Sequence, residues 1–202
     1  MMVTRIFVKS YENPKLNKKE ILRYLDSAPG TEIDDLVDGC IAEAVDKLTY
    51  KLCYARFPIS VSGEDLDLGF TRVSSHSLTL CLKECDEIVL FCATVGVGID
   101  RLIKRYSAIS PSKAVVLQAL GSERVEALCD EFCAELALEE GAKGREIRPR
   151  FSPGYGDLPL EIQKDVFATL TPEKHVGVSL GADLFMTPTK NVTAIIGIKN
   201  VK

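Results

Sequence analysis

Apolar residues recur at helical spacing in the first quarter of the chain. Over residues 33–48 they follow the period of about 3.6 residues that is typical of an amphipathic helix, and Thr31 and Asp34 are placed to cap its start. Residues 17–25 open with the Asn-x-x-Glu pattern of a capping box, which predicts a shorter helix. Each helix needs a partner for its apolar face, most simply a sheet.

The longest helical pattern begins at Ser110-Pro111, a cap residue followed by the residue that suits the first helical position. It continues to about Glu140, and Gly121 is a point where it could break. Acidic side chains lie at or beside the edge of its apolar stripe, where most such groups are simply solvated. The stripe consists of Val125, Leu128, Cys129, Phe132 and Leu136, and the acids are Glu123, Glu126, Asp130 and Glu131.

Strand-like segments are interspersed with these helices. Residues 3–9 alternate as an edge strand does, and residues 87–93 form the continuous apolar run of a buried strand. Residues 52–61 and 66–73 fit an antiparallel hairpin, and a terminal hairpin is expected over residues 184–198. Because strands and helices do not alternate regularly, the pattern predicts an α+β fold with a twisted, mainly antiparallel sheet and long helices packed on it.

The predicted buried strand runs into Gly96-Val-Gly98, which invites comparison with a nucleotide-binding turn. A strand, a glycine turn and a helix are the context that a dinucleotide site needs. The third glycine position holds Arg101, however, and no clean mononucleotide-binding unit precedes the turn. We therefore interpret the two glycines as a structural turn, which is common at a strand end.

Length and charge narrow the class of protein. With 202 residues, 46% of them hydrophobic, the chain suits one core, and we expect a single domain over residues 1–202. The formal net charge is −4 and Lys and Arg form no dense cluster, which argues against nucleic acid or an anionic membrane as the main partner. Neither a signal peptide nor a membrane-length apolar run is apparent, so we expect a cytoplasmic protein.

Seven cysteines are scattered through apolar positions, which fits reduced core thiols better than a disulfide framework. Cys81/Cys85 and Cys129/Cys133 are each one helical turn apart. Neither pair has a second Cys/His pair nearby, so we expect no metal site. His175 has no cysteine, serine or second histidine placed with it, and we expect it to pack or hydrogen-bond rather than to act as an acid or base.

The most informative segment is Arg148–Pro159, which holds three prolines and two glycines between two helical patterns. This composition excludes helix and regular strand. Arg150 offers a planar cation for a carboxylate or phosphate, Gly154 allows close backbone approach, and the Tyr155 ring can cover an aromatic or cationic group. On these residues alone, a surface connector whose arginine caps a nearby carboxylate is the simpler interpretation.

The order of features around this segment changes that interpretation. The series consists of Arg150-x-x-x-Gly-Tyr, a helical segment at 160–170, Thr-Pro-Glu-Lys-His-Val-Gly at 171–177, Met186-x-Pro188 and a strand over 192–197. It resembles the activation domain of cobalamin-dependent methionine synthase. The resemblance is close over residues 148–198 and looser over most of residues 14–147.

In that family the loop binds S-adenosylmethionine. The resemblance implies that Arg150 binds the carboxylate of this ligand, that the backbone around Ser152 and Gly154 meets its amino acid or adenine edge, and that Tyr155 lies beside it. It implies no catalytic residue, because the methyl group leaves a sulfonium without acid or base catalysis and alignment with the acceptor supplies the rate.

The family also has a glutamate on the long helix that contributes to the S-adenosylmethionine site. The resemblance assigns this acid to Glu126, although the match falls at Glu126 or at neighbouring Ala127, with Glu131 as a second choice. Where many members have Gly-Tyr-Pro-Ala-Cys-Pro, this chain has Gly156-Asp157-Leu158 after the tyrosine, which adds a carboxylate. Longer members continue with a segment that contributes a tyrosine, so the site is expected to be more open or completed by a partner.

The family's reaction implies the function. Cobalamin oxidised to the cob(II) form receives an electron from a flavodoxin-like or ferredoxin-like donor and is methylated from S-adenosylmethionine. This chain would serve methionine biosynthesis as a reactivation protein that acts in trans on a separate methionine synthase or other corrinoid protein, which carries the cobalamin. The alternative is a non-catalytic interaction or small-ligand-binding protein that kept the fold. A self-contained methyltransferase fits less well, because no acceptor-activating constellation is present.

Overall fold

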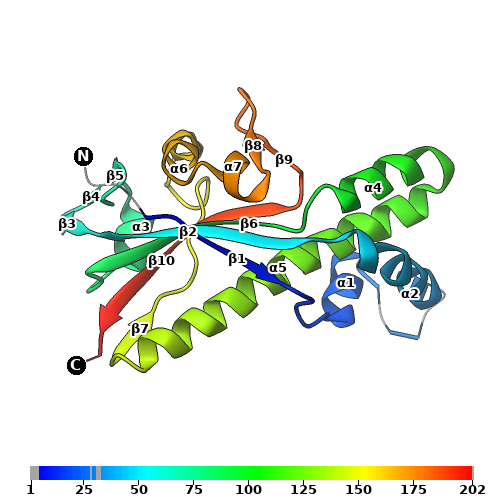
Figure 1. The fold of residues 1–202 in the computed structure, drawn as a ribbon, viewed down its shortest axis with the longest axis horizontal. Helices are drawn as coiled ribbons and strands as arrows, with labels where there is room; N and C mark the ends of the chain where they lie inside the picture. Colours follow the sequence, from blue (N-terminus) through cyan, green and yellow to red (C-terminus); the bar gives the residue numbers. More distant parts are fainter. Residues whose placement is uncertain (1–4, 28, 31–32, 202) are drawn as a thin grey trace.

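A five-stranded sheet is the centre of the computed structural model, which describes residues 5–27, 29–30 and 33–201 (Figure 1). The strand order is β1-β2-β6-β10-β7, and each pair of neighbours is antiparallel. The bounds are Phe7–Tyr11 for β1, Tyr50–Pro58 for β2, Glu87–Thr94 for β6, Arg145–Ile147 for β7 and Asn191–Asn200 for β10. The predicted α+β class with an antiparallel sheet is confirmed.

The sheet is buried on both faces at its centre. Alternate residues of a strand point to opposite faces, so β6 contributes to two separate cores. Val89, Phe91 and Ala93 belong to the first, whereas Ile88, Leu90 and Cys92 belong to the second. This double burial explains the continuous apolar run that predicted a buried strand over residues 87–93.

Helices cover both faces. The first core contains residues of α1 (Lys18–Tyr24), α2 (Ile33–Ala44), α4 (Gly98–Ile109) and α5 (Pro111–Gly141). The second contains residues of α3 (His76–Cys81), the 3-10 turn η2 (Leu160–Ile162), α6 (Gln163–Leu170) and α7 (Pro172–Val176). Figure 1 shows α5 running along the sheet, with α6 and α7 on the opposite side. A further 3-10 turn, η1 (Val45–Lys47), follows α2.

Helix α5 is unbroken over 31 residues, so the break considered at Gly121 is wrong. This glycine lies where other elements pack closely on the helix. A Cβ atom there would lie 3.1 Å from Cγ1 of Ile99 on α4 and 2.9 Å from Cγ of Lys190. Gly121 is therefore explained by close packing within a continuous helix.

The first predicted hairpin, residues 52–61 with 66–73, is wrong in extent. Strand β2 ends at Pro58 and pairs with β1 and β6, because its apolar residues are buried on both faces of the main sheet. A separate small sheet holds β3, β4 and β5. These span Ser60–Ser62, Asp65–Asp67 and Arg72–Ser74, and a turn at Gly63 and Glu64 joins β3 to β4.

The predicted terminal hairpin over residues 184–198 is also wrong. Strand β9 (Met186–Thr187) pairs with β8 (Ser179–Leu180), whereas β10 pairs with β6 and β7. The long, apolar strand β10 lies between β6 and β7 in the main sheet, where it is mostly buried. Val3, in the predicted first strand, and Thr31, the predicted cap of α2, lie outside the described residues.

Candidate functional site

The loop Arg148–Pro159 starts as an extension of the main sheet. The backbone N–H of Arg148 donates to the carbonyl of Gly197 at 2.8 Å, and Phe151 exchanges two hydrogen bonds of 2.9 Å with Ile195. Both partners lie on β10. The first residues of the loop are therefore fixed by backbone pairing, which accounts for a defined position of Arg150 between them.

The rest of the loop is a compact turn. The N–H of Tyr155 donates to the carbonyl of Ser152 at 3.1 Å, and the N–H of Gly154 donates to the carbonyl of Leu158 at 3.0 Å. Gly154 has a φ of +84°, a conformation that favours glycine. The amides of Gly154 and Tyr155 are thus engaged within the turn itself.

Asp157 anchors this turn to α3. Its carboxylate accepts hydrogen bonds from Ser75 Oγ at 2.6 Å and from the backbone N–H groups of His76 at 2.7 Å and Ser77 at 3.1 Å. The Ser75 hydroxyl and the two amides lower the pKa of the Asp157 carboxyl. The carboxylate that distinguishes this loop from many members of the resembled family is therefore a structural tie.

Arg150 extends from the loop to α5. Its Nη2 lies 3.0 Å from Glu126 Oε2 and 2.8 Å from Asp130 Oδ1. The two acids are one helical turn apart, so they project side by side from α5. The loop therefore crosses α5 beside Glu126 and Asp130.

A cavity of about 770 Å³ lies around this ion pair, and we call it the loop cavity. Its lining includes Arg150, Ser152 and Glu126, three of the residues that the sequence suggested. Tyr155 does not line the cavity. This residue is 70% exposed, and its ring packs edge-on against the Phe151 ring, with 5.4 Å between the ring centroids. The remaining lining residues are Asp130, Cys133, Ile147, Arg148, Pro149 and Val192.

Gly154 is exposed and lies outside this lining as well, and Glu131 lies in a neighbouring groove. Sequence reasoning did not propose Asp130 for the site. Its spacing of four residues after Glu126 is a signal that could have found it, because residues i and i+4 share a helix face.

The loop cavity brings charged groups of both signs together. One guanidinium faces two carboxylates, so this trio carries a net charge of about −1 when all three are ionised. Burial raises the pKa of the Cys133 thiol to about 11, which keeps it protonated at neutral pH. The residues lining the cavity can thus hold cationic and anionic groups of a ligand and orient it.

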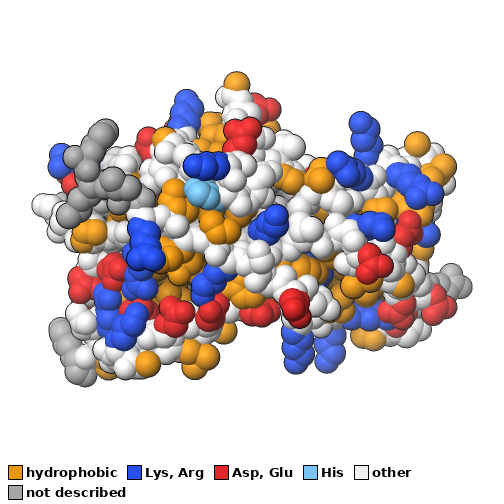
Figure 2. Space-filling model, viewed as in Figure 1, with side chains coloured by type: hydrophobic (Ala, Val, Ile, Leu, Met, Phe, Trp, Pro, Cys, Tyr) orange, Lys and Arg blue, Asp and Glu red, His pale blue; other side chains and the backbone are white. Residues whose placement is uncertain are grey.

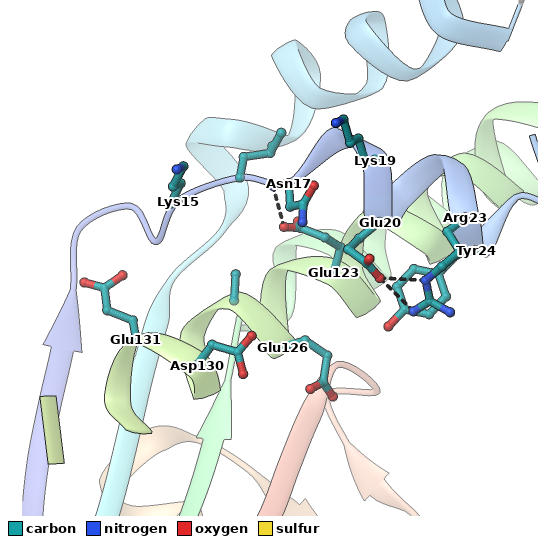
Figure 3. A pocket seen from close by; sticks show the side chains of 12 residues that line it. Lys15, Asn17, Lys19, Glu20, Arg23, Tyr24, Glu123, Glu126, Asp130 and Glu131 are labelled. Atoms are coloured by element: carbon teal, nitrogen blue, oxygen red, sulfur yellow. Dashed lines mark hydrogen bonds and ion pairs between the residues drawn. The ribbon is translucent and has the colours of Figure 1, made fainter. Parts of the chain in front are cut away.

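A second cavity adjoins the first, and we call it the α1 groove. It measures about 960 Å³ and shares Glu126 and Asp130 with the loop cavity. Figure 3 shows side chains of α1 and the segment before it on one side, facing acidic side chains of α5 on the other. The lining consists of Lys15, Leu16, Asn17, Lys19, Glu20, Arg23, Tyr24, Glu123, Glu126, Ala127, Asp130 and Glu131.

Other kinds of site are not apparent in the described part of the chain. No group of three or more His, Cys, Asp or Glu side chains there could hold a metal ion, and none of its helices could cross a membrane. Across the face drawn in Figure 2, basic and acidic side chains are interspersed. The described cysteines are all free, and four of the seven are buried.

Together, the curled antiparallel sheet, the long helix α5 and the loop that crosses it define an α+β fold. A solved structure of this fold is the crystal structure of the MetH reactivation domain bound to AdoHcy. The match has a TM-score of 0.68 at 14% sequence identity and covers 97% of this chain and 79% of that chain. Neither a protein-family model nor a curated protein sequence matches this chain.

Proposed function

We propose that this chain binds S-adenosylmethionine in the loop cavity and supports reductive methylation of cob(II)alamin in a separate methionine synthase or other corrinoid protein. The observation that carries the proposal is the placement of Arg150, Glu126 and Ser152 around one cavity, on the fold of a domain that binds AdoHcy. AdoHcy is what remains of S-adenosylmethionine after methyl transfer, which makes the methyl donor a reasonable ligand here.

The charges of the cavity fit this ligand. S-adenosylmethionine carries a carboxylate, an ammonium and a sulfonium. A guanidinium can hold the carboxylate as a planar fork, and a carboxylate of α5 can accept hydrogen bonds from the ammonium. Arg150 on the loop and the two acids on one turn of α5 offer both kinds of partner side by side.

The role of this chain would be presentation of the methyl group. A flavodoxin-like or ferredoxin-like protein would supply one electron to the partner's cob(II)alamin, and the reduced cobalt would take the methyl group from the sulfonium, leaving AdoHcy. Here the residues of the loop cavity bind and orient the donor. Catalysis would come from alignment of donor and acceptor, and no residue of this chain has to move a proton.

Calorimetric titration with S-adenosylmethionine tests the proposal, with the Arg150→Ala protein beside the unaltered one. Loss of the guanidinium should weaken binding by about 1.5–3 kcal/mol, since it removes a charge-assisted hydrogen bond to the ligand's carboxylate. The matched control is Arg72→Ala, which removes an arginine paired with Asp67 in the small sheet. Its affinity should equal that of the unaltered protein.

If the Arg150→Ala protein binds S-adenosylmethionine as tightly as the unaltered protein, Arg150 does not belong to the binding site. If the unaltered protein binds no S-adenosylmethionine, the titration is repeated with a cobalamin-loaded corrinoid protein present. Binding only in that mixture would mean that the partner completes the site. No binding in either case would favour a non-catalytic or small-ligand-binding protein that kept the fold.

A further inference from the structure

An ion pair is buried on α5 one turn before Glu126. Glu123 and Arg124 are 3% and 1% exposed, and Arg124 is among the largest fully buried side chains. Arg124 Nε lies 2.6 Å from Glu123 Oε2, and its Nη2 lies 2.7 Å from Glu123 Oε1. This two-pronged contact leaves guanidinium N–H groups that must find other acceptors, because burying them unpaired would be costly.

Two of those acceptors belong to the segment just before α1. Arg124 Nη1 donates to the carbonyl of Pro14 at 2.6 Å and Nη2 donates to the carbonyl of Lys15 at 3.1 Å. Glu123 Oε1 accepts the backbone N–H of Asn17 at 2.8 Å. We call residues 14–17 the strap. It is held to α5 by three hydrogen bonds, all from this one ion pair.

The ion pair replaces a local cap. The sequence predicted a capping box in which Glu20 would accept the N–H of Asn17, but Glu20 pairs with Arg23 instead. Helix α1 is the shortest of the four helices on its face of the sheet, at 7 residues. Such a helix has little stability of its own, so its position depends on what fixes its start.

The strap is also a wall of the candidate site. Lys15 and Asn17 line the α1 groove across from the α5 acids, as Figure 3 shows, and the dashed line from Asn17 marks its bond to Glu123. The α1 groove and the loop cavity meet at Glu126 and Asp130. Displacement of the strap would therefore widen the space beside the two acids that hold Arg150.

A buried ion pair is a poor source of stability, since apolar residues of similar volume often serve as well. What an arginine supplies here is geometry, because its planar fork reaches one carboxylate and two carbonyls at once. We propose that Arg124 is a positioning residue for the ligand site. It fixes the strap as the wall of the α1 groove that faces the α5 acids, so that a ligand held at Arg150 is confined on the α1 side. This inference rests on the proposed S-adenosylmethionine binding.

The test compares Arg124→Lys with Arg56→Lys. Lysine keeps the positive charge beside Glu123 but lacks the planar fork that reaches both strap carbonyls. Arg56 is a matched control, because it pairs with the fully buried Glu140 near the C-terminal end of α5, about 24 Å along the helix from Arg124. Each protein is studied by calorimetry with S-adenosylmethionine and by hydrogen exchange of the amides in residues 15–24. Arg124→Gln is a second variant that removes the charge.

In the Arg124→Lys protein we expect faster exchange of the Asn17 amide and S-adenosylmethionine affinity lower by about tenfold, a change of about 1.4 kcal/mol. The Arg56→Lys protein should bind S-adenosylmethionine as tightly as the unaltered protein. This should hold even if its melting temperature falls as much as that of the Arg124→Lys protein. Unchanged affinity in a protein whose strap exchanges faster would overturn the inference, as would unchanged exchange in both Arg124 variants. If the unaltered protein binds no S-adenosylmethionine either alone or with a cobalamin-loaded corrinoid protein present, the proposed function itself fails, and this inference with it.

Discussion

At the scale of single residues, the contacts of Arg150 determine what the proposed ligand would have to displace. Its Nη2 is already within hydrogen-bonding distance of both Glu126 and Asp130. Both N–H groups of this nitrogen are thus engaged, so a ligand carboxylate that binds at Nη2 would compete with one of the two acids. The Asp130 side chain is 73% exposed and that of Glu126 is 43% exposed, so Asp130 regains water more completely when displaced. We expect Asp130 to be the carboxylate that yields.

This exchange predicts opposite effects for the two acids. Asp130→Asn should strengthen S-adenosylmethionine binding by about 1 kcal/mol because it removes the competitor, whereas Glu126→Gln should weaken it by a similar amount because the ammonium loses a charged acceptor. Calorimetric titration at low salt measures both. Glu139→Gln, on a distant turn of α5, is the control. Weaker binding by the Asp130→Asn protein would show that Asp130 itself contacts the ligand.

Sequence reasoning reached part of this site. Arg150 was proposed from a loop motif, whereas Glu126 rested on the family resemblance, whose match fell at Glu126 or at Ala127. The partner of the Asn17 amide could not be proposed, because Glu123 lies 106 residues away and nothing local indicates that it replaces Glu20. The engagement of Arg150 by two acids was also hidden, since it depends on how the loop crosses α5.

At the scale of elements, the turn at Gly96-Val-Gly98 illustrates steric demand. Gly98 is the first residue of α4, and a Cβ atom there would overlap the backbone carbonyl oxygen of Lys47. The end of β6 and the start of α4 thus pack directly on the segment after α2. This contact accounts for the glycine without any nucleotide, in agreement with its interpretation as a structural turn.

A pair of glycine substitutions separates packing from helix propensity. Gly98→Ala should lower the free energy of unfolding by about 1–3 kcal/mol because the backbone of residue 47 has to move. Gly39→Ala, inside α2 where an added Cβ contacts nothing within 4 Å, should raise it by up to about 1 kcal/mol. Urea denaturation of both proteins measures the difference. Equal stability of the Gly98→Ala protein and the unaltered one would contradict the packing argument.

The elements that the sequence predicted well are those whose position is marked by local sequence signals. Ser110-Pro111 marks the start of α5, and the apolar run over residues 87–93 marks β6. Pairing between strands was predicted poorly. β10 has the composition of a strand, but its partner β6 lies about a hundred residues earlier, and a local hairpin was the wrong default. Register and neighbours depend on the whole sheet, which a local pattern does not contain.

At the scale of the whole molecule, α5 connects two places where charge is buried. Near its middle, Arg124 and Glu123 fix the strap beside the site. At its end, Glu140 is fully buried and contacts Arg56 at 2.9 Å, Lys143 at 2.8 Å and Arg145 at 3.4 Å. This second cluster joins α5 to β2 and β7. It is therefore a tie between layers of the fold, remote from the candidate site.

The cluster predicts how stability depends on pH. Burial alone would raise the pKa of Glu140, but hydrogen bonds from Lys143 and Arg56 outweigh it and hold the pKa below its usual value. A carboxyl whose pKa is lower in the folded state contributes stability above its unfolded pKa of about 4.3, and this contribution is lost as pH falls through the folded pKa. The protein should lose stability on the acid side below about pH 4–5.

Glu140→Gln tests this assignment because it keeps the shape of the side chain and removes the charge. At pH 7 the variant should be less stable by about 1–3 kcal/mol, since Arg56 and Lys143 lose a charged partner. The difference should shrink as pH falls below about 4, where the unaltered protein also becomes protonated at this site. Denaturation at a series of pH values measures it, with the exposed Glu146→Gln as control. A stability difference that stays constant down to pH 3 would mean that Glu140 acts through packing. The acid sensitivity would then belong to other carboxylates such as Glu87. Burial opposes a lower pKa for Glu87, but hydrogen bonds from Arg56 and Arg145 outweigh it and lower the pKa.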